Sequence, residues 1–450
     1  MSSMEFNTYK LSEICDVKSG KRLPVGSNFS DEITDYPYIR ARDIKNGKID
    51  SSSLAYIDEN LHKKLKKYII NEGDIALTVV ANIGDVGYCE KELDGVNLTE
   101  NAIRLTNFKN NIDSKYLTYF LSQPFSKLYM EGLAAGAAQS KLGIYKVNKI
   151  KVLIPNLDFQ KRIVSIISNY DQLIENNNKR IKILEDMAES LYKEWFVRFR
   201  FPGYETAEFE NGIPKGWIVG NLLDIMLLHD SKRKPISSLE RSQKEKLYPY
   251  YGAAELMDYI DDYLFDGRYL LMGEDGSVIT SEGYPVLQFI EGKFWVNNHA
   301  HVISGTTNYS INFIYSLLKK LSINDIVTGA AQPKISIGRM KKKKILIPNL
   351  EMVKKYSDVV EPIFNDIFKI KNINQLLIRQ RDALLPRLMS GKIDVENMNK
   401  SNSKCETNVI SFDQFKQMFE MQSAARAKEI LEDDIKASYE VYINDKNKKS

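Results

Sequence analysis

The sequence predicts an α+β fold in which two α/β modules follow each other in tandem and are joined by two long antiparallel helices that form a coiled coil. Three observations predict this fold. A stretch of sequence is repeated without a gap, each copy is followed by a heptad pattern of apolar residues, and each copy is preceded by a series of short β-type segments.

The repeat is the main evidence for two modules. Residues 136–157 read GAAQSKLGIYKVNKIKVLIPNL, and residues 329–350 read GAAQPKISIGRMKKKKILIPNL. The copies are offset by 193 residues and agree at 13 of 22 positions, which is more than shared composition produces. We interpret the match as an internal duplication in which a GAAQ-x-K turn leads into a strand.

Short β-type segments precede each copy. Runs of β-branched and aromatic residues bounded by Gly, Asp and Asn predict strands within 36–44 and 73–87, and a helix-like pattern covers 114–130. The second half repeats this plan with three strand-like segments and one helix-like segment, at 248–256, 266–279, 294–303 and 311–321. Because the two halves differ inside, we expect one architecture with two different binding surfaces.

A heptad pattern follows each copy. Seam positions recur at alternating steps of four and three along 163–195 and 356–388, and the two series coincide at the 193-residue offset. Each helix of about 40 residues would be roughly 60 Å long at about 1.5 Å per residue. A single stripe of this kind usually packs on its own domain, whereas two matched stripes favour helices that pack on each other.

Two asparagines predict the direction of the helix pair. In a parallel pair in repeat register, Asn177 would face Ile370 and Asn374 would face Ile181. In an antiparallel pair about a pseudo-two-fold axis through residue 179, the two asparagines face each other. A buried Asn costs less beside a polar partner, so we predict antiparallel helices with an Asn177–Asn374 contact near their centre.

These patterns divide the chain into five regions. We predict modules at 1–157 and 201–350, long helices at 158–200 and 351–398, and a flexible linker with an amphipathic C-terminal extension at 399–450. For the extension, docking on a partner and local packing or mobility both remain open.

Composition narrows the class of protein. With 63 Lys+Arg against 59 Asp+Glu, the net charge of +4 permits a polyanionic partner without requiring one. The chain has no long apolar run and no apolar signal core at its N-terminus, so we expect a cytoplasmic protein without a membrane span. Cys15, Cys89 and Cys405 lie far apart and form no C-x-x-C pair, which argues against a disulfide framework or structural zinc.

Catalytic motifs are scarce. The chain contains no phosphate-binding loop and no Pro-Pro pair, so neither an NTPase nor a DNA amino-methyltransferase is indicated. His299 and His301 alternate in a strand-like segment and would share a face, as core histidines, as readers of a ligand or, less favoured, as metal ligands. An enzyme would have to combine these histidines with Glu274 or Asp275, but the two carboxylates are better explained as residues of a turn. We expect no metal site.

Basic residues gather in both halves among Tyr and Asn. The clusters are Lys18, Lys21, Arg22, Arg40, Arg42 and Lys45 in the first half, and Lys232, Arg233, Lys234, Arg241, Lys244, Lys246 and Arg268 in the second. One such run is usually a solvated surface, whereas clusters in both halves fit phosphate contacts combined with base-edge readout. The repeated GAAQ-x-K segment is either a structural turn or a nucleic-acid contact.

Several motifs taken together resemble the specificity subunit of type I restriction–modification enzymes. They are YPYIRARDI (36–44), the GDI…G pattern (73–84), LYKEWFVRFRFPG (191–203), DYLFDGRYLLMGEDG (262–276), VNNHA (296–300), RDALLPRLMSGKIDV (381–395) and the two GAAQ…IPNL copies. The resemblance covers roughly residues 8–396 and leaves out the C-terminal extension.

The resemblance implies a non-catalytic subunit with two target recognition domains. Each would read one half of a split, asymmetric target on double-stranded DNA, with the helices setting the spacing. Two modification subunits would methylate adenine with S-adenosylmethionine, and two motor-nuclease subunits would use ATP and Mg; this chain itself would bind no cofactor. The alternative is a coiled-coil scaffold of a defence complex that does not read DNA.

The resemblance also suggests which residues would contact DNA. They are Lys21, Arg22, Arg40, Arg42, Gln139 and Lys141 in the first module, and Lys232, Arg233, Arg268, Asn297, His299, Gln332 and Lys334 in the second. Lys would hold phosphates, while Arg, Asn, Gln and His would discriminate bases at about 1–3 kcal/mol for each good bidentate contact.

Overall fold

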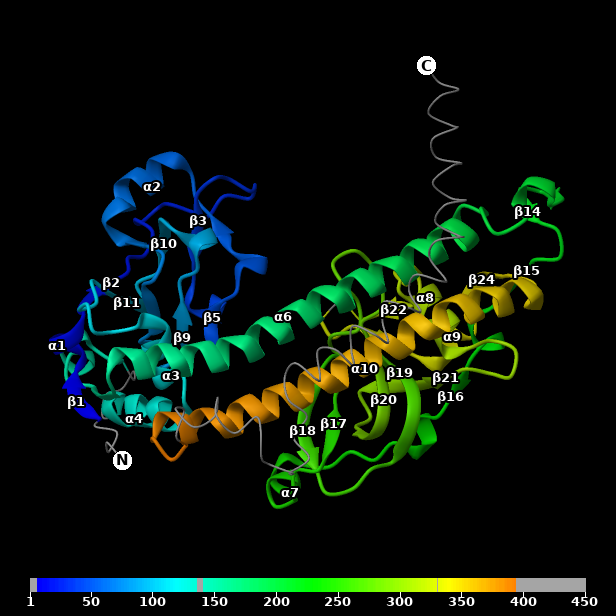
Figure 1. Cartoon of the computed structure of the whole chain (residues 1–450). Coiled ribbons are helices and arrows are strands. Elements are labelled where there is room, and N and C mark those ends of the chain that lie inside the picture. Colours follow the sequence, from blue (N-terminus) through cyan, green and yellow to red (C-terminus); the bar gives the residue numbers. More distant parts are fainter. Residues whose placement is uncertain (1–5, 136–140, 330, 394–450) are drawn as a thin grey trace. The chain divides into compact units, whose positions relative to one another are not determined.

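The computed structural model describes residues 6–135, 141–329 and 331–393 (Figure 1). The predicted C-terminal extension and Gln139 lie outside the described residues. Among the helices described, none is both long and apolar enough to cross a membrane. The chain up to Met389 forms one compact unit, which contains both modules and both long helices.

The first module is built on a six-stranded sheet. In order across the sheet, its strands are β2 (Asp16–Ser19), β11 (Ala102–Thr106), β8 (Ile75–Thr78), β9 (Val86–Tyr88), β5 (Gly47–Ile49) and β4 (Ile44–Lys45). A second sheet has the order β6 (Ala55–Tyr56), β3 (Pro37–Ile39), β10 (Val96–Leu98) and β7 (Ile69–Ile70). One buried apolar cluster draws Ala76 and Ile49 from the first sheet and Ile39, Ile70 and Leu98 from the second, so the two sheets share a core.

The helices of the first module are short. They are α1 (Leu11–Ile14), α2 (Glu59–Leu65), α3 (Ser114–Leu121), α4 (Pro124–Ala134) and α5 (Ile144–Val147). The single helix predicted across 114–130 is two helices, because α3 ends at Leu121 and Pro124 opens α4. Proline lacks the amide that a continuing helix needs but is well suited to a first turn.

The second module repeats the six-stranded sheet. Its strands, in order, are β16 (Leu227–Leu228), β21 (Ala300–Ser304), β19 (Phe265–Gly273), β20 (Leu287–Val296), β17 (Tyr248–Tyr251) and β18 (Leu256–Ile260). In both six-stranded sheets the fourth and fifth strands are parallel and the other neighbours are antiparallel. The remaining elements are α7 (Ser238–Ser242), α8 (Ile311–Leu318), α9 (Ile337–Met340) and the strand pairs β13 (Phe209–Glu210) with β14 (Ile213–Pro214) and β22 (Val327–Thr328) with β23 (Lys334–Ile335).

One predicted strand of this module is divided. The segment 294–303 contains the end of β20, a turn, and β21, which begins at Ala300. His299 therefore lies in an exposed turn while His301 is buried in a strand, and the expectation that they share a face is wrong.

In each module, a strand near the N-terminal side pairs with the module's last strand. β1 (Asn7–Lys10) is antiparallel to β12 (Lys151–Ile154), and β15 (Ile218–Asn221) is antiparallel to β24 (Lys344–Ile347). The last strand of each pair comes from the repeated sequence and leads directly into a long helix. Each module is thus closed at the point where its helix begins.

The long helices are α6 (Leu157–Tyr192) and α10 (Leu350–Met389), of 36 and 40 residues. The asparagine of each repeated IPNL segment caps its helix: Asn156 accepts from the Phe159 amide and Asn349 from the Met352 amide, both at 2.9 Å. α6 continues as a π-helical turn to Val197 and so ends before the predicted residue 200.

The described helix ends have local causes. Beyond the π turn of α6, Phe199 adopts a positive φ of 57°, which no helical residue has. Beyond α10, Gly391 has a φ of 67°, a left-handed conformation that commonly follows a helix, so α10 stops at Met389, short of the predicted residue 398.

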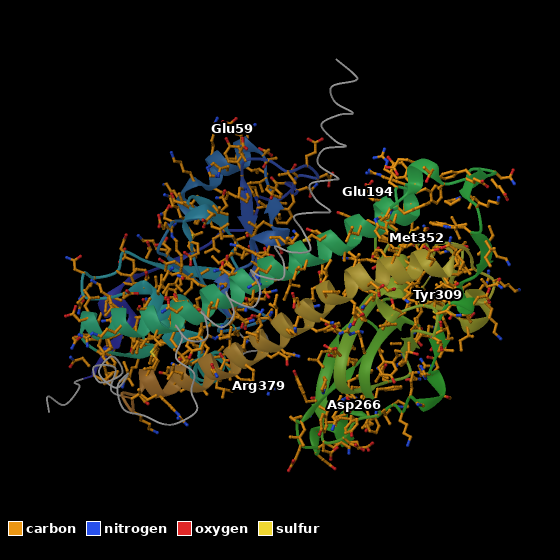
Figure 2. All side chains as sticks on the ribbon, turned by 45° about the vertical axis from the view of Figure 1, so that its right-hand side comes forward. Glu59, Glu194, Asp266, Tyr309, Met352 and Arg379 are labelled. Carbon is orange, nitrogen blue, oxygen red and sulfur yellow. The ribbon has the colours of Figure 1, made fainter. Side chains whose placement is uncertain are left out.

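The two long helices run antiparallel and lie side by side (Figure 1). Asn177 Nδ2 donates to Asn374 Oδ1 at 2.8 Å, which is the contact that the sequence register predicts. Asp171, nearer the start of α6, accepts from Arg381 at 2.7 Å, nearer the end of α10. Figure 2 shows the side chains along the pair; Arg379 lies on the exposed side of α10.

Candidate nucleic-acid interface

In each module, several loops meet at one end of the six-stranded sheet. In the first module this is the end at which β2 and β8 finish and β11 begins. In the second module it is the end at which β16 and β19 finish and β21 begins. We call it the loop edge. It consists of residues 20–22, 79–81, 99–101 and 141–142 in the first module and 229–234, 274–278, 297–299 and 332–335 in the second.

The repeated GAAQ-x-K segment ends at this loop edge in both modules. The amide of Leu142 donates to the Val79 carbonyl at 2.9 Å, and the amide of Ile335 donates to the Glu274 carbonyl at 2.8 Å. These equivalent bonds fasten the residue after each repeated lysine to the loop that follows β8 or β19. The backbone on the C-terminal side of each repeated lysine is therefore held in place, which positions Lys141 and Lys334 at the loop edge.

Both repeated lysines are exposed. Lys141 forms an isolated bridge with Val80, and Lys334 forms one with Asp275, while both side chains remain in solvent. Gln332 is exposed beside Lys334. Each loop edge thus presents a flexible cation on an ordered backbone, the arrangement that phosphate contacts use.

Lys21 and Arg22 lie at the loop edge of the first module, and both are exposed. The amide of Lys21 donates to the Leu98 carbonyl at 2.9 Å, which fixes the chain as it leaves β2. The preceding residue, Gly20, packs so closely that a Cβ atom would lie 2.0 Å from the Thr99 carbonyl oxygen. Only glycine fits there, because a side chain would collide with the backbone at Thr99.

Arg40 and Arg42 have different environments. Arg40 is bound to Asp43 through Nε at 3.1 Å and Nη2 at 3.3 Å, and it also donates to the Ser53 carbonyl. These bonds occupy its guanidinium, so the structure favours an internal role over the DNA contact predicted for it. Arg42 has a 67% exposed side chain and can reach a ligand.

In the second module, Lys232 and His299 are accessible. Lys232 is exposed on a 3-10 turn after β16. The His299 side chain is 47% exposed, and its Nδ1 is bound to the Asp275 carboxylate. That bond leaves Nε2 as the ring nitrogen available to a ligand.

Two other predicted DNA contacts are internal. Arg268 on β19 is bound to Glu291 at 2.7 Å and reaches α10, where it binds Glu361 at 3.0 Å and Asn365 at 2.7 Å. The side chain of Asn297 is buried, and its Oδ1 accepts from the amide two residues on at 2.9 Å. For both residues, partners inside the protein already use the polar atoms, so the structure favours internal roles over the predicted DNA contacts. The α10 partners of Arg268 are distant in sequence, whereas the Oδ1 of Asn297 is held by a local backbone amide.

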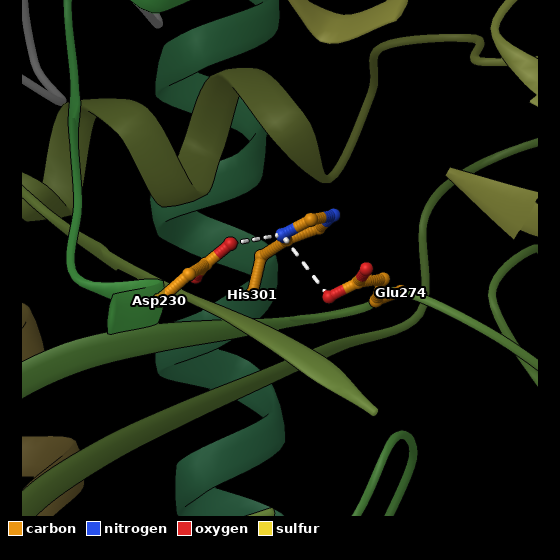
Figure 3. A group of neighbouring side chains, drawn as sticks. All are labelled: Asp230, Glu274 and His301. Atoms are coloured by element: carbon orange, nitrogen blue, oxygen red, sulfur yellow. Dashed lines mark hydrogen bonds and ion pairs between the residues drawn. The ribbon is translucent and has the colours of Figure 1, made fainter. Parts of the chain in front are cut away.

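Arg233 belongs to a group of ionisable side chains below the loop edge, which we call the buried charge network: Asp230, Arg233, Glu274 and His301. Figure 3 shows Asp230 and Glu274 on either side of the His301 ring, at 2.6 and 3.7 Å from its Nδ1. Arg233 contacts Glu274 at 2.7 Å and Asp230 at 3.4 Å. Only 12% of its side chain is exposed, so its predicted DNA contact is not supported.

The network resembles a metal or catalytic site in composition but not in bonding. The ligand atoms of Asp230, Glu274 and His301 lie within 4.8 Å of one another. The Arg233 guanidinium already supplies the positive charge between the two carboxylates. His301 is fully buried and its Nε2 lies 2.9 Å from the Ile335 carbonyl, so both ring nitrogens are engaged and neither can act on a substrate.

The network also fixes the charge of Asp230. Burial alone would raise the pKa of this carboxyl, but hydrogen bonds from His301 and the Val302 amide, with the charges of His301 and Arg233, hold the pKa below its ordinary value. Sequence reasoning did not single out Asp230, because its hydrogen-bond partner His301 lies 71 residues away, and the nearby Arg233 does not by itself make a recognisable motif.

The chain matches the family model for the type I restriction modification DNA specificity domain twice, over residues 4–186 and 214–377. It is 28% identical over 419 residues to the type I restriction enzyme MjaIX specificity subunit of Methanocaldococcus jannaschii, covering 86% of this chain and 96% of that one. It is 22% identical over 365 residues to the EcoprrI specificity subunit of Escherichia coli, covering 78% and 86%.

A solved structure has the same fold. The S subunit of a type I restriction-modification system from M. genitalium superposes with a TM-score of 0.50 at 17% identity, over 86% of this chain and 97% of that one. At this identity the likeness concerns the fold alone. The two matches to the family model fall on the two halves that the internal repeat defines.

Proposed function

Because the chain belongs to the family of type I restriction modification DNA specificity proteins, we propose that it is the specificity subunit of a type I complex and reads a bipartite, asymmetric target on double-stranded DNA. Each module reads one half of the target, and the helix pair sets the distance between the halves. Two modification subunits then methylate adenine with S-adenosylmethionine, and two motor-nuclease subunits cleave unmodified DNA with ATP and Mg. The chain itself performs no catalysis and binds no cofactor.

One observation carries this proposal: the two modules have the same strand order and the same loop edge, but their exposed side chains differ. A shared frame with an exposed lysine at Lys141 and Lys334 suits phosphate contacts, which are the same for any sequence. Different neighbours, such as Arg22 in one module and His299 in the other, suit discrimination between bases. Two related modules joined by antiparallel helices match the two-fold symmetry of duplex DNA.

Methylation mapping tests the proposal. DNA is sequenced for methylated bases from cells that express the modification subunit with and without this chain. We expect a split, asymmetric adenine-methylated motif only when the chain is present. Replacing residues 8–157 with the corresponding module of another family member should change one half of the motif and leave the other half unchanged.

The scaffold alternative predicts the opposite result. If the methylated motif persists without the chain, or is unchanged by exchange of the module, the chain does not read DNA. Lys334→Ala gives a finer test, because loss of one phosphate contact should weaken binding to all sequences alike and lower the salt-dependence slope by about 1. Lys355→Ala is a matched control: both side chains are 51% exposed, but Lys355 lies on α10, where it pairs with Glu351.

A further inference from the structure

Among the residues that the structure describes, the buried charge network lies in the second module and has no counterpart in the first. Strand register identifies the equivalent positions: Ser19 lies opposite Ile103 in the β2–β11 ladder, and Asp230 falls opposite His301 when the β16–β21 register is extended. His301 is fully buried and Ile103 is 2% exposed, so a buried histidine in one module corresponds to a buried isoleucine in the other.

Glu274 has an apolar equivalent as well. Val79 follows β8 and Glu274 follows β19, and their amides donate to the carbonyls of Asn101 and His299, both at 2.8 Å. Val79 is 2% exposed. The first module therefore builds the same loop edge with Val79, Ile103 and Ser19, none of which is ionisable.

The fold does not require the network, since the first module closes its sheet without it. Buried ion pairs are seldom more stabilising than apolar side chains of similar volume, because the cost of removing charges from water offsets their attraction. Breaking one by removal of a single partner is expensive. A charged cluster in place of Val79 and Ile103 therefore indicates a role other than stability.

What the network does is connect the four segments of the second loop edge. Arg233 Nη1 donates to Glu274 at 2.7 Å and to the carbonyls of Asn298 at 3.3 Å and Ala300 at 2.7 Å. His301 connects the 3-10 turn at Asp230 with the Ile335 carbonyl. The turn after β16, the loop after β19, the turn before β21 and the end of the repeated segment are thus held by one set of bonds.

The side chains expected to read DNA stand on these same segments. Lys232 lies between Asp230 and Arg233, and His299 lies between the two residues whose carbonyls Arg233 binds. Lys334 precedes Ile335 and approaches Glu274 at 3.5 Å. A change in any network member would therefore shift the exposed side chains that these segments carry.

We propose that the buried charge network positions the loop edge of the second module and thereby sets the base preference at that half of the target. Its members are positioning residues, because they act through Lys232, His299 and Lys334 rather than by touching bases. This inference rests on the proposed function, and it assigns specificity to residues that sequence comparison of exposed loops would overlook.

The test replaces three network residues with the residues at the equivalent positions of the first module. The triple variant Asp230→Ser, Glu274→Val, His301→Ile is assembled with its partner subunits and compared with wild type. Binding is measured on duplexes that carry the mapped methylation motif and on duplexes with single base changes in either half. We expect discrimination at the second half-site to fall about ten-fold or more, the equivalent of about one good base contact, while discrimination at the first half-site stays unchanged.

A general loss of stability would behave differently, because it would lower affinity for every duplex in the same proportion. Full discrimination at both half-sites in a folded triple variant would overturn the inference. A wild-type complex that discriminates at neither half-site would instead remove the proposed function itself, so the two failures are distinguishable.

A second variant covers the case in which the triple variant does not fold. Arg233→Lys keeps the charge but replaces a fork of donors by a single ammonium, which cannot reach Glu274 and both carbonyls in the same geometry. Discrimination at the second half-site should again fall, and Arg379→Lys, at an exposed position of α10 outside the loop edge, is the matched control. Unchanged discrimination in Arg233→Lys would contradict the network's role.

Discussion

Individual arginines of this protein have different roles that residue type alone does not reveal. The Arg42 side chain is 67% exposed and makes a longer contact to Asp43 at 3.6 Å, whereas Arg40, Arg233 and Arg268 are each held by a carboxylate and at least one further acceptor within the protein. A guanidinium has five donors in a rigid fork, so it suits internal bridging as well as DNA contact. The partner within reach decides between these roles.

At the residue scale, Asp230 should make the second module sensitive to acid. A pKa below the ordinary value means that the ionised carboxylate stabilises the folded state above about pH 4, and that this stability is lost as the pH falls through the native pKa. Asp230→Asn should therefore cost about 2 kcal/mol of unfolding free energy near pH 7. The difference from wild type should shrink as the pH falls below about 4 and through the lowered native pKa, because Asp230 then becomes neutral like asparagine. Urea unfolding at a series of pH values measures this, and a constant difference would contradict it.

The two described cysteines should be inert. Burial raises the pKa of the Cys15 and Cys89 thiols to about 12, so almost no thiolate is present at neutral pH. Neither should react with iodoacetamide in the folded protein, and both should react after denaturation. Peptide mass spectrometry of alkylated protein distinguishes the two states; rapid labelling of either thiol in native protein would show that these sites open.

At the scale of the elements, the helix pair shows how a polar contact fixes register. Asn177 and Asn374 are each 7% exposed within a mainly apolar seam, and Asn374 donates in turn to Asn178 at 2.9 Å. An apolar seam alone tolerates a shift by one heptad, because each Leu or Ile then meets another. An asparagine pair does not tolerate that shift, since both amides would be left without partners.

A double-mutant cycle tests this coupling. Asn177→Leu or Asn374→Leu alone should cost about 1–3 kcal/mol, because the remaining amide is buried without its partner. The double variant should recover part of that loss, with a coupling energy of about 1 kcal/mol or more. Thermal or urea unfolding gives the values, and Asn372→Leu, at an exposed position of α10, is the control. Strict additivity would mean that the amides do not depend on each other.

At the scale of the whole molecule, the second module is attached to the helices by specific bonds. Tyr356 on α10 donates to Ser316 of α8 at 3.0 Å and to the Ala188 carbonyl of α6 at 3.2 Å. The rings of Trp195 and Phe196 pack edge-on against Tyr356. Arg268 adds the bonds from β19 to α10. Together they connect the reading module to the element proposed to set the spacing.

Arg268→Ala should therefore weaken the attachment of the second module to α10 and leave the DNA contacts unchanged. It should lower the unfolding free energy by about 2 kcal/mol, since Glu361 and Glu291 lose a charged partner. The salt-dependence slope of DNA binding should stay unchanged. Arg42→Ala should show the reverse pattern, with little change in stability and a slope lower by about 1. An altered salt-dependence slope for Arg268→Ala would instead indicate that Arg268 contacts DNA.

The sequence by itself determined the duplication, the two long helices and their antiparallel direction, because these depend on periodicity, on a gap-free repeat and on the pairing of Asn177 with Asn374. The family was indicated separately, by the resemblance of several motifs taken together, such as residues 36–44 and 262–276. The sequence also identified Lys141 and Lys334 as equivalent residues, since the repeat aligns them. Only the tertiary structure decided which polar side chains remain accessible. Arg233 is bonded to Glu274, 41 residues away, and Arg268 to Glu361, 93 residues away. A hydrogen bond between distant segments leaves no local pattern in a single sequence. The packing of the strands and helices therefore decides whether such an arginine remains accessible to a ligand.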